Sequence, residues 1–232
     1  MKNIFFLFTM LLLGGSEMAH AQLEGKRFIS GSAGINFSNQ NPSQVAASNN
    51  YGYNFNINLG KFKTDTRVSG WSLSNSLGGK KANYYTSNNG ESKIIDKSGI
   101  NNVGFGLGKF WHFYKHFNDK LGIFGGPDIS LGYLNAKEFS TLSNSHELLE
   151  TQTSKISLSF GLNAGLYYKL SEKWWVSGSL AFSNPFNVGY AFTKSEIGDQ
   201  SYGGKTKQLT YAFSPSFTFP SVGFGLRYFY GR

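Results

Sequence analysis

The chain has 232 residues, a net charge of +9, 17% aromatic and 15% charged residues, 29 glycines and no cysteine. The lack of cysteine excludes disulfides, thiolate metal sites and a lipid anchor on a cysteine. Beyond residue 13 no run of 18 apolar residues occurs, so we expect no transmembrane helix in that part. Any attachment of this part to a membrane must therefore come from its fold.

The amino terminus has the features of a secretory signal peptide. Lys2 precedes the apolar run 4–13, and the small-residue site Ala19-His20-Ala21 precedes Gln22. An apolar run of 10 residues is too short to span a bilayer, which takes about 20. We therefore expect cleavage between Ala21 and Gln22, with 1–21 as the signal peptide and 22–232 as one domain.

The exported part alternates apolar residues with small or polar ones, which is the period of a β-strand. One face of these strands is apolar, and the other is rich in Ser, Gly and Asn, which suits the lumen of a membrane barrel better than a surface in water. The alternation recurs, and we predict eight strands, near 27–37, 51–62, 70–77, 98–114, 121–134, 155–169, 174–183 and 208–230. The last is expected to be broken at Pro220-Ser221, because proline cannot donate to a strand ladder.

The connections between these strands alternate in length. Those after the second, fourth and sixth strands are short, whereas those at about 39–50, 79–97, 135–153 and 184–207 are long and rich in Asn, Ser, Gly and Lys. Short turns lie on the periplasmic side of outer-membrane barrels and long loops lie outside. We therefore predict an all-β fold, an eight-stranded antiparallel up-and-down transmembrane β-barrel of the outer membrane, closed without free edges and with both termini periplasmic. A soluble secreted barrel or sandwich that binds a ligand is the alternative.

Aromatic and charged residues suggest where the membrane and the lumen lie. Residues expected at the membrane interface, close to the short turns or the carboxyl terminus, are Trp71, Trp111, Phe113, Trp174, Trp175, Tyr228 and Tyr230. Asp128 and Arg227 are the charged candidates for the lumen. A salt bridge between them is one interpretation, and separate hydrogen-bonded side chains is the interpretation that we favour.

Three segments carry a resemblance to a known family. The run GKFWHFYKHFNDKLGIFGGPDISLGY (108–133), the hairpin SLSFGLNAGLYYKLSEKWWVSGSLAF (157–182) and the ending SVGFGLRYFY (221–230) resemble the outer membrane protein beta-barrel domain family, and the chain is similar in size to small OmpA- and OmpX-type barrels. The resemblance spans essentially the whole exported part through diffuse patterns. It implies an integral eight-stranded barrel in a family whose members mostly have no assigned activity.

Enzymatic and channel functions have weaker support. A lipid-modifying barrel enzyme needs a histidine beside a nucleophile or a carboxylate at a membrane-level cleft. Among the exported histidines, His112 and His116 lie around a predicted periplasmic turn, where we expect an interfacial cluster of aromatic residues and histidines. His146 is next to Glu147 but falls in a long loop, where we expect it to be solvated. No group has the spacing of a metal site, so we expect no catalytic residue, metal or cofactor. An eight-stranded barrel is filled by side chains, which leaves a narrow channel as an alternative only.

Charge suggests partners for the two ends of the barrel. Most of the positive charge falls on the predicted periplasmic side, which favours contact with anionic headgroups of outer-membrane lipids. Biogenesis implies the barrel assembly machinery, and the long outer loops are candidates for an unknown protein or glycan partner. Basic residues dispersed among the turns of an exported chain do not favour nucleic acid. A structural or interaction role, without catalysis, is the leading prediction.

Overall fold

The computed structural model describes residues 23–40, 47–88, 91–141, 147–197, 204–214 and 223–231. The predicted signal peptide with its cleavage site at Ala21 and Gln22 lies outside the described residues, as do His146 and Pro220-Ser221. Within the described ranges, no helix is long and apolar enough to cross a membrane.

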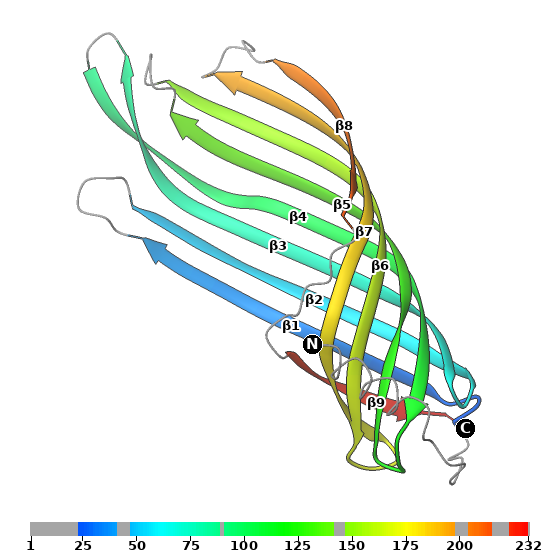
Figure 1. Cartoon of the computed structure of the whole chain (residues 1–232). Coiled ribbons are helices and arrows are strands. Elements are labelled where there is room, and N and C mark those ends of the chain that lie inside the picture. Colours follow the sequence, from blue (N-terminus) through cyan, green and yellow to red (C-terminus); the bar gives the residue numbers. More distant parts are fainter. Residues whose placement is uncertain are drawn as a thin grey trace, which may run out of the picture.

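In the described part of the chain, nine antiparallel strands form a single sheet (Figure 1). Their bounds are β1 Arg27–Gln40, β2 Ser48–Thr64, β3 Arg67–Asn88, β4 Glu91–His116, β5 Leu121–Thr141, β6 Leu148–Lys169, β7 Trp174–Ile197, β8 Lys205–Phe213 and β9 Gly223–Tyr230. Each strand from β1 to β7 pairs with the next, and β9 pairs with both β7 and β1. The chain is therefore all-β, with eight strands in a closed ring.

The predicted last strand is in fact two strands. β8 pairs with residues 186–194 of β7, and β9 pairs with residues 174–179 of β7 and 27–31 of β1. In the described part of the chain, residues 32–40 of β1 pair with β2 alone, and β8 pairs with β7 alone. Among the described residues, β1 and β8 are therefore not paired with each other in this half of the barrel, and the sheet without free edges stays a prediction there (Figure 1).

Much of the sequence predicted as long loops is also strand. β3 and β4 remain paired out to Asn88 and Glu91, and β5, β6 and β7 remain paired to Thr141, Leu148 and Ile197. Polar side chains join these outer segments, as between Thr153 and Thr193, whose Oγ1 atoms lie 3.1 Å apart. The prediction of loops was wrong because it rested on the length of these segments and their content of Asn, Ser, Gly and Lys. Within β7 the apolar residues Phe186, Val188, Tyr190 and Phe192 continue the alternation of a strand.

The short connections lie together at the opposite end of the barrel, as predicted. Asn118 Oδ1 accepts hydrogen bonds from the backbone N–H groups of Lys120 (2.9 Å) and Leu121 (2.7 Å). Ser171 Oγ plays the same part in the next turn, where it accepts from Lys173 (3.3 Å) and Trp174 (3.1 Å). Side-chain oxygens that bind the backbone in this way favour tight turns, which return each strand directly to its neighbour.

The interior at the end with the short turns is filled by aromatic and aliphatic side chains. This aromatic layer consists of Leu23, Phe28, Phe62, Val68, Phe110, Tyr114, Tyr167, Trp175 and Phe229, and Phe124 packs against it. Its rings are in close contact, with centroids 4.8 Å apart for Tyr167 and Trp175 and 4.4 Å apart for Trp175 and Phe229. The layer closes one end of the lumen with a packed hydrophobic core.

The amino-terminal residues of the described chain seal this end. Asp65 Oδ1 accepts hydrogen bonds from the backbone N–H groups of Leu23 (2.7 Å) and Glu24 (3.2 Å). The N–H of Gly25 donates to the carbonyl of Phe62 at 3.0 Å. These contacts hold the segment before β1 across the turn between β2 and β3, with Leu23 buried in the aromatic layer.

Candidate functional site

The outer face of the barrel carries a belt of exposed apolar side chains. Tyr133, Ile156 and Tyr190 are register partners on three neighbouring strands, and all three are exposed. In β6 the outward residues follow one another without a charge: Ile156, Leu158, Phe160, Leu162, Ala164, Leu166 and Tyr168. Exposure of so much contiguous apolar surface indicates contact with something other than water.

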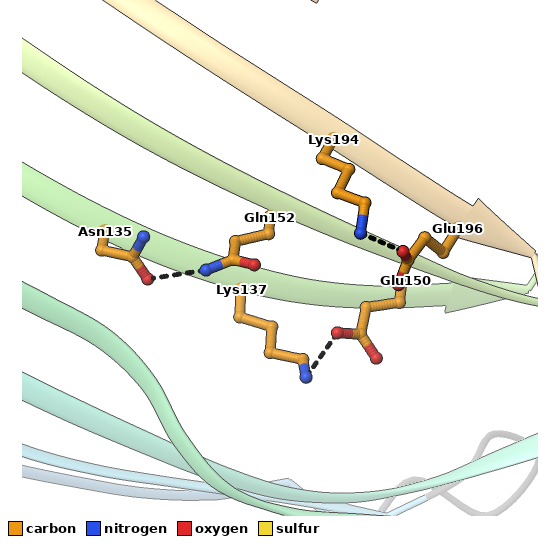
Figure 2. A network of polar contacts seen from close by, with 6 residues as sticks. All are labelled: Asn135, Lys137, Glu150, Gln152, Lys194 and Glu196. Carbon is orange, nitrogen blue, oxygen red and sulfur yellow. Dashed lines mark hydrogen bonds and ion pairs between the residues drawn. The ribbon is translucent and has the colours of Figure 1, made fainter. Parts of the chain in front are cut away.

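A polar collar lies above this belt, on strands β5 to β7 (Figure 2). Its members lie at least two residues from Tyr133, Ile156 and Tyr190, on the side away from the short turns. They are Asn135, Lys137, Glu150, Gln152, Lys194 and Glu196. Lys137 forms an ion pair with Glu150, and Lys194 forms one with Glu196. Glu150 and Glu196 are direct cross-strand partners, so the lysines offset the repulsion between two carboxylates. Polar side chains at these outward positions mark the upper limit of the belt.

The aromatic residues predicted for the membrane interface divide into two groups. Trp71, Trp111, Phe113, Trp174 and Tyr230 are exposed near the short-turn end of the belt, and Tyr228 packs against Trp174 with ring centroids 4.9 Å apart. Their contact with a membrane interface stays a prediction. The prediction for Trp175 was wrong, because this side chain belongs to the aromatic layer inside the barrel. Consecutive residues of a strand point to opposite faces, so Trp174 and Trp175 cannot both face outward.

A basic pocket lies on the outer wall near the same end. This basic rim pocket, of about 250 Å³, is lined by Arg27, Leu59, Gly60, Lys61, Lys63, Ser69, Gly70, Trp71, Lys109 and Tyr230. The ammonium of Lys109 lies 4.5 Å from the centroid of the Trp71 ring. Four cations line the pocket, with no carboxylate among the described lining residues, and two aromatic rings border it. The arrangement can bind an anionic group beside an apolar surface.

The two charged residues predicted for the lumen line one internal cavity of about 330 Å³. This lumenal cavity is bounded by Phe28, Ser30, Asn56, Asn58, Ser72, Phe110, His112, Phe124, Asp128, Asn163 and Arg227. Asn163 Nδ2 donates to Asp128 Oδ2 at 3.3 Å, whereas Arg227 donates to the hydroxyl of Tyr114. No ion pair is found between Asp128 and Arg227 in the described structure, and the two side chains have separate hydrogen-bond partners.

The guanidinium of Arg227 is nearly enclosed by rings. Only 6% of the residue is exposed, and its Cζ lies 4.3 Å from the ring centroid of Phe124 and 5.2 Å from that of Phe28. Its Nε is buried and has no hydrogen-bond partner within the described structure. The rings offer a cation–π contact to the charge, but they do not satisfy this N–H group.

His112 is a second lumenal group, which sequence reasoning placed at the membrane interface. The residue is 9% exposed, and neither ring nitrogen has a hydrogen-bond partner among the described residues. Its ring lies between those of Phe110 (4.6 Å) and Phe124 (5.4 Å). The signal was present in the sequence, since His112 shares its strand face with Phe110 and Tyr114 and not with the outward Trp111 and Phe113.

His116 is held at the base of the barrel. Its Nε2 lies 3.0 Å from the carbonyl oxygen of Asp65, and its Nδ1 contacts the hydroxyl of Tyr167. Across the described ranges, no group of three or more His, Asp or Glu side chains is arranged to hold a metal ion.

No protein-family model and no curated protein matches the chain. Among solved structures, the chain is similar to the crystal structure of the beta domain of the Bordetella autotransporter Brka, at 9% sequence identity and a TM-score of 0.32. The match covers 89% of this chain and 84% of the Brka chain.

Proposed function

We propose that the protein is an integral outer-membrane β-barrel with a structural or interaction role and no catalytic activity. The observation that carries this proposal is the height of the apolar belt. From Ile156 to Tyr168 the strand rises about 40 Å along its axis, and a strand tilt of about 45° reduces this to about 30 Å along the barrel axis. This height matches the hydrocarbon core of a bilayer, which is about 30 Å thick.

The boundaries of the belt support the same proposal. The polar collar ends the belt on one side, and exposed aromatic residues and the basic rim pocket end it on the other. A lipid-facing surface flanked by aromatic residues and charges is typical of membrane barrels. In this arrangement the short turns and both termini are periplasmic, and the outer parts of β3 to β8 stand above the membrane.

The aromatic layer favours a non-conducting barrel over a channel. An eight-stranded barrel is narrow enough for side chains to fill it, and here large rings pack across its periplasmic end. Ions would have to pass through a layer in which Trp175, Phe62 and Phe28 are almost completely buried. We therefore propose a role carried by surfaces of the barrel.

Two surfaces are available for that role. The basic rim pocket faces the inner leaflet, where anionic phospholipid headgroups are its proposed partners. The outer hairpins carry polar and charged side chains on a paired, rigid scaffold, on which recognition of a protein or a glycan is favoured. Insertion of the chain is proposed to depend on the barrel assembly machinery.

Fractionation combined with gel mobility tests the membrane assignment. The outer-membrane fraction is run in mild detergent with and without boiling, since a closed barrel migrates differently before and after unfolding. We expect the protein in this fraction, with a mobility shift on boiling and an amino-terminal sequence that begins at Gln22. Recovery in the soluble periplasm without a shift would overturn the proposal and favour a soluble barrel or sandwich.

A further inference from the structure

The lumenal cavity contains polar groups that the rest of the chain leaves unsatisfied. Arg227 Nε, both ring nitrogens of His112 and Asn163 Oδ1 are buried without a hydrogen-bond partner among the described residues. A buried guanidinium without a carboxylate partner costs several kcal/mol of desolvation that the aromatic rings around it only partly offset. A cavity with several such groups is therefore built to hold a polar occupant.

These groups fall into two pairs of opposite character. Arg227 and His112 both contact the ring of Phe124 and both line the cavity, where they offer N–H donors. Asp128 and Asn163 are joined by a hydrogen bond, and they present carboxylate and amide oxygens. The cavity thus offers one cationic donor, one imidazole donor and a pair of acceptors within one volume of about 330 Å³.

We propose that the lumenal cavity is a binding site for a small zwitterion of the α-amino acid type. The ligand carboxylate accepts from Arg227 and His112, and its ammonium donates to Asp128 and Asn163. A simple anion would be repelled by the carboxylate of Asp128, and a simple cation would be repelled by Arg227. One water occupies about 30 Å³ of liquid, so the cavity has room for a molecule of about ten non-hydrogen atoms.

The fold also provides a way in. The aromatic layer blocks the cavity from the end with the short turns. Ser30 lines the cavity, and the pairing of β1 with β9 ends one residue further on, at Gly31. The described part of β1 beyond this level pairs with β2 alone, so we expect a polar ligand to enter from the end of the barrel away from the aromatic layer.

The test is ligand binding to the full-length, refolded protein in detergent micelles. Each of the common α-amino acids is titrated separately and followed by saturation-transfer NMR and calorimetry, with acetate and ethylamine as the two halves of the zwitterion. We expect at least one small polar amino acid to bind with a dissociation constant below about 1 mM, and acetate and ethylamine to bind at least tenfold more weakly.

Two variants that each remove a charge locate the site. Asp128→Asn and Arg227→Gln each remove one charge, and each is expected to weaken binding of the amino acid at least tenfold. Asp119→Asn and Arg67→Gln make the same changes at exposed positions of the turn end, and are expected to leave binding unchanged. The boiling-dependent mobility shift shows which variants fold. If Arg227→Gln does not fold, Asp128→Asn alone still tests the site.

Three results would overturn the proposal. The first is binding of none of the amino acids at about 10 mM, which leaves water as the occupant. The second is binding of acetate as tight as that of any amino acid, which indicates a simple anion site. The third is equal affinity in Asp128→Asn and the protein without substitutions. None of these results bears on the membrane assignment, which the mobility shift tests separately.

Discussion

Trp174 and Trp175 are consecutive residues of β7 whose side chains lie on opposite faces of the barrel wall, with exposed fractions of 44% and 1%. Trp174 packs against Tyr228 on the outside, whereas Trp175 stacks on Tyr167 within the aromatic layer. This pair separates the exposed outer surface from the internal core within one dipeptide.

Trp175→Ala is expected to destabilise the barrel by about 3–5 kcal/mol, because it removes a large buried ring and leaves a cavity. Trp174→Ala is the matched control. It is expected to reduce the free energy of unfolding by less than half as much, because lipid is expected to fill the space left by this exposed side chain. Urea unfolding of the protein in lipid vesicles measures both values. Equal losses in the two variants would contradict the assignment of Trp175 to the core.

Fluorescence distinguishes the same two residues independently of stability. Brominated lipids quench indoles that contact the acyl chains. In variants that keep only Trp174 or only Trp175, with phenylalanine at the other three tryptophan positions, we expect strong quenching of Trp174 and little quenching of Trp175. Quenching of both would show that the aromatic layer is open to lipid.

Gly70 lies where a side chain would collide with the aromatic layer. A Cβ at this position would sit 2.2 Å from Cζ of Phe110 and 2.4 Å from the carbonyl oxygen of Leu59. Gly70→Ala is therefore expected to cost about 1–3 kcal/mol through overpacking. At Gly225 the nearest atom lies 3.5 Å away, so Gly225→Ala is expected to change stability by less than about 0.5 kcal/mol. Unfolding in urea compares the pair, and a loss in Gly225→Ala as large as in Gly70→Ala would argue against this packing.

Asp65 holds the segment before β1 in place through the N–H groups of Leu23 and Glu24. Asp65→Ala removes this acceptor and is expected to cost about 0.5–2 kcal/mol, as the loss of a helix cap does. The measurement is hydrogen exchange, in which the amides of Leu23 and Glu24 should lose protection. Asp119→Ala, in the short turn between β4 and β5, is the control. Unchanged protection of the Leu23 and Glu24 amides in Asp65→Ala would show that Asp65 does not hold this segment in place.

The basic rim pocket is expected to enrich anionic phospholipid around the protein. Replacement of Lys61 and Lys63 by glutamine removes two of its four cations, and each charge near a membrane surface is worth about 1 kcal/mol of attraction to anionic lipid. We expect the ratio of anionic to zwitterionic phospholipid that copurifies with the protein to fall several-fold, as measured by mass spectrometry. The double replacement of Lys80 and Lys81 by glutamine at the other end should leave this ratio unchanged, and equal ratios in all three proteins would contradict the proposed partner.

The ion pairs of the polar collar are expected to contribute little to stability. Lys137 and Glu150 are partly exposed, with 38% and 28% of their side chains accessible, and exposed pairs are worth about 0–1 kcal/mol. Lys137→Met should therefore shift the free energy of unfolding by less than about 1 kcal/mol. A larger shift in urea unfolding would mean that the outer hairpins are held together by charge and not by backbone pairing.

The amino-acid sequence by itself determined the strand alternation, the positions of the short turns and the inward placement of Asp128 and Arg227. These features are local, because side chains alternate between the faces of any strand and turn residues act on their own backbone. The apolar belt follows from the same alternation, without knowledge of which strands are neighbours.

Only the tertiary structure decided which inward residues meet. Phe28, Trp175 and Phe229 come from three different strands, and their packing depends on register across the closed ring. The same register brings Arg227 and His112 to the ring of Phe124. Contacts between residues more than a hundred positions apart leave no periodic signal in one sequence, which is why the lumenal cavity emerges only when the strands are paired.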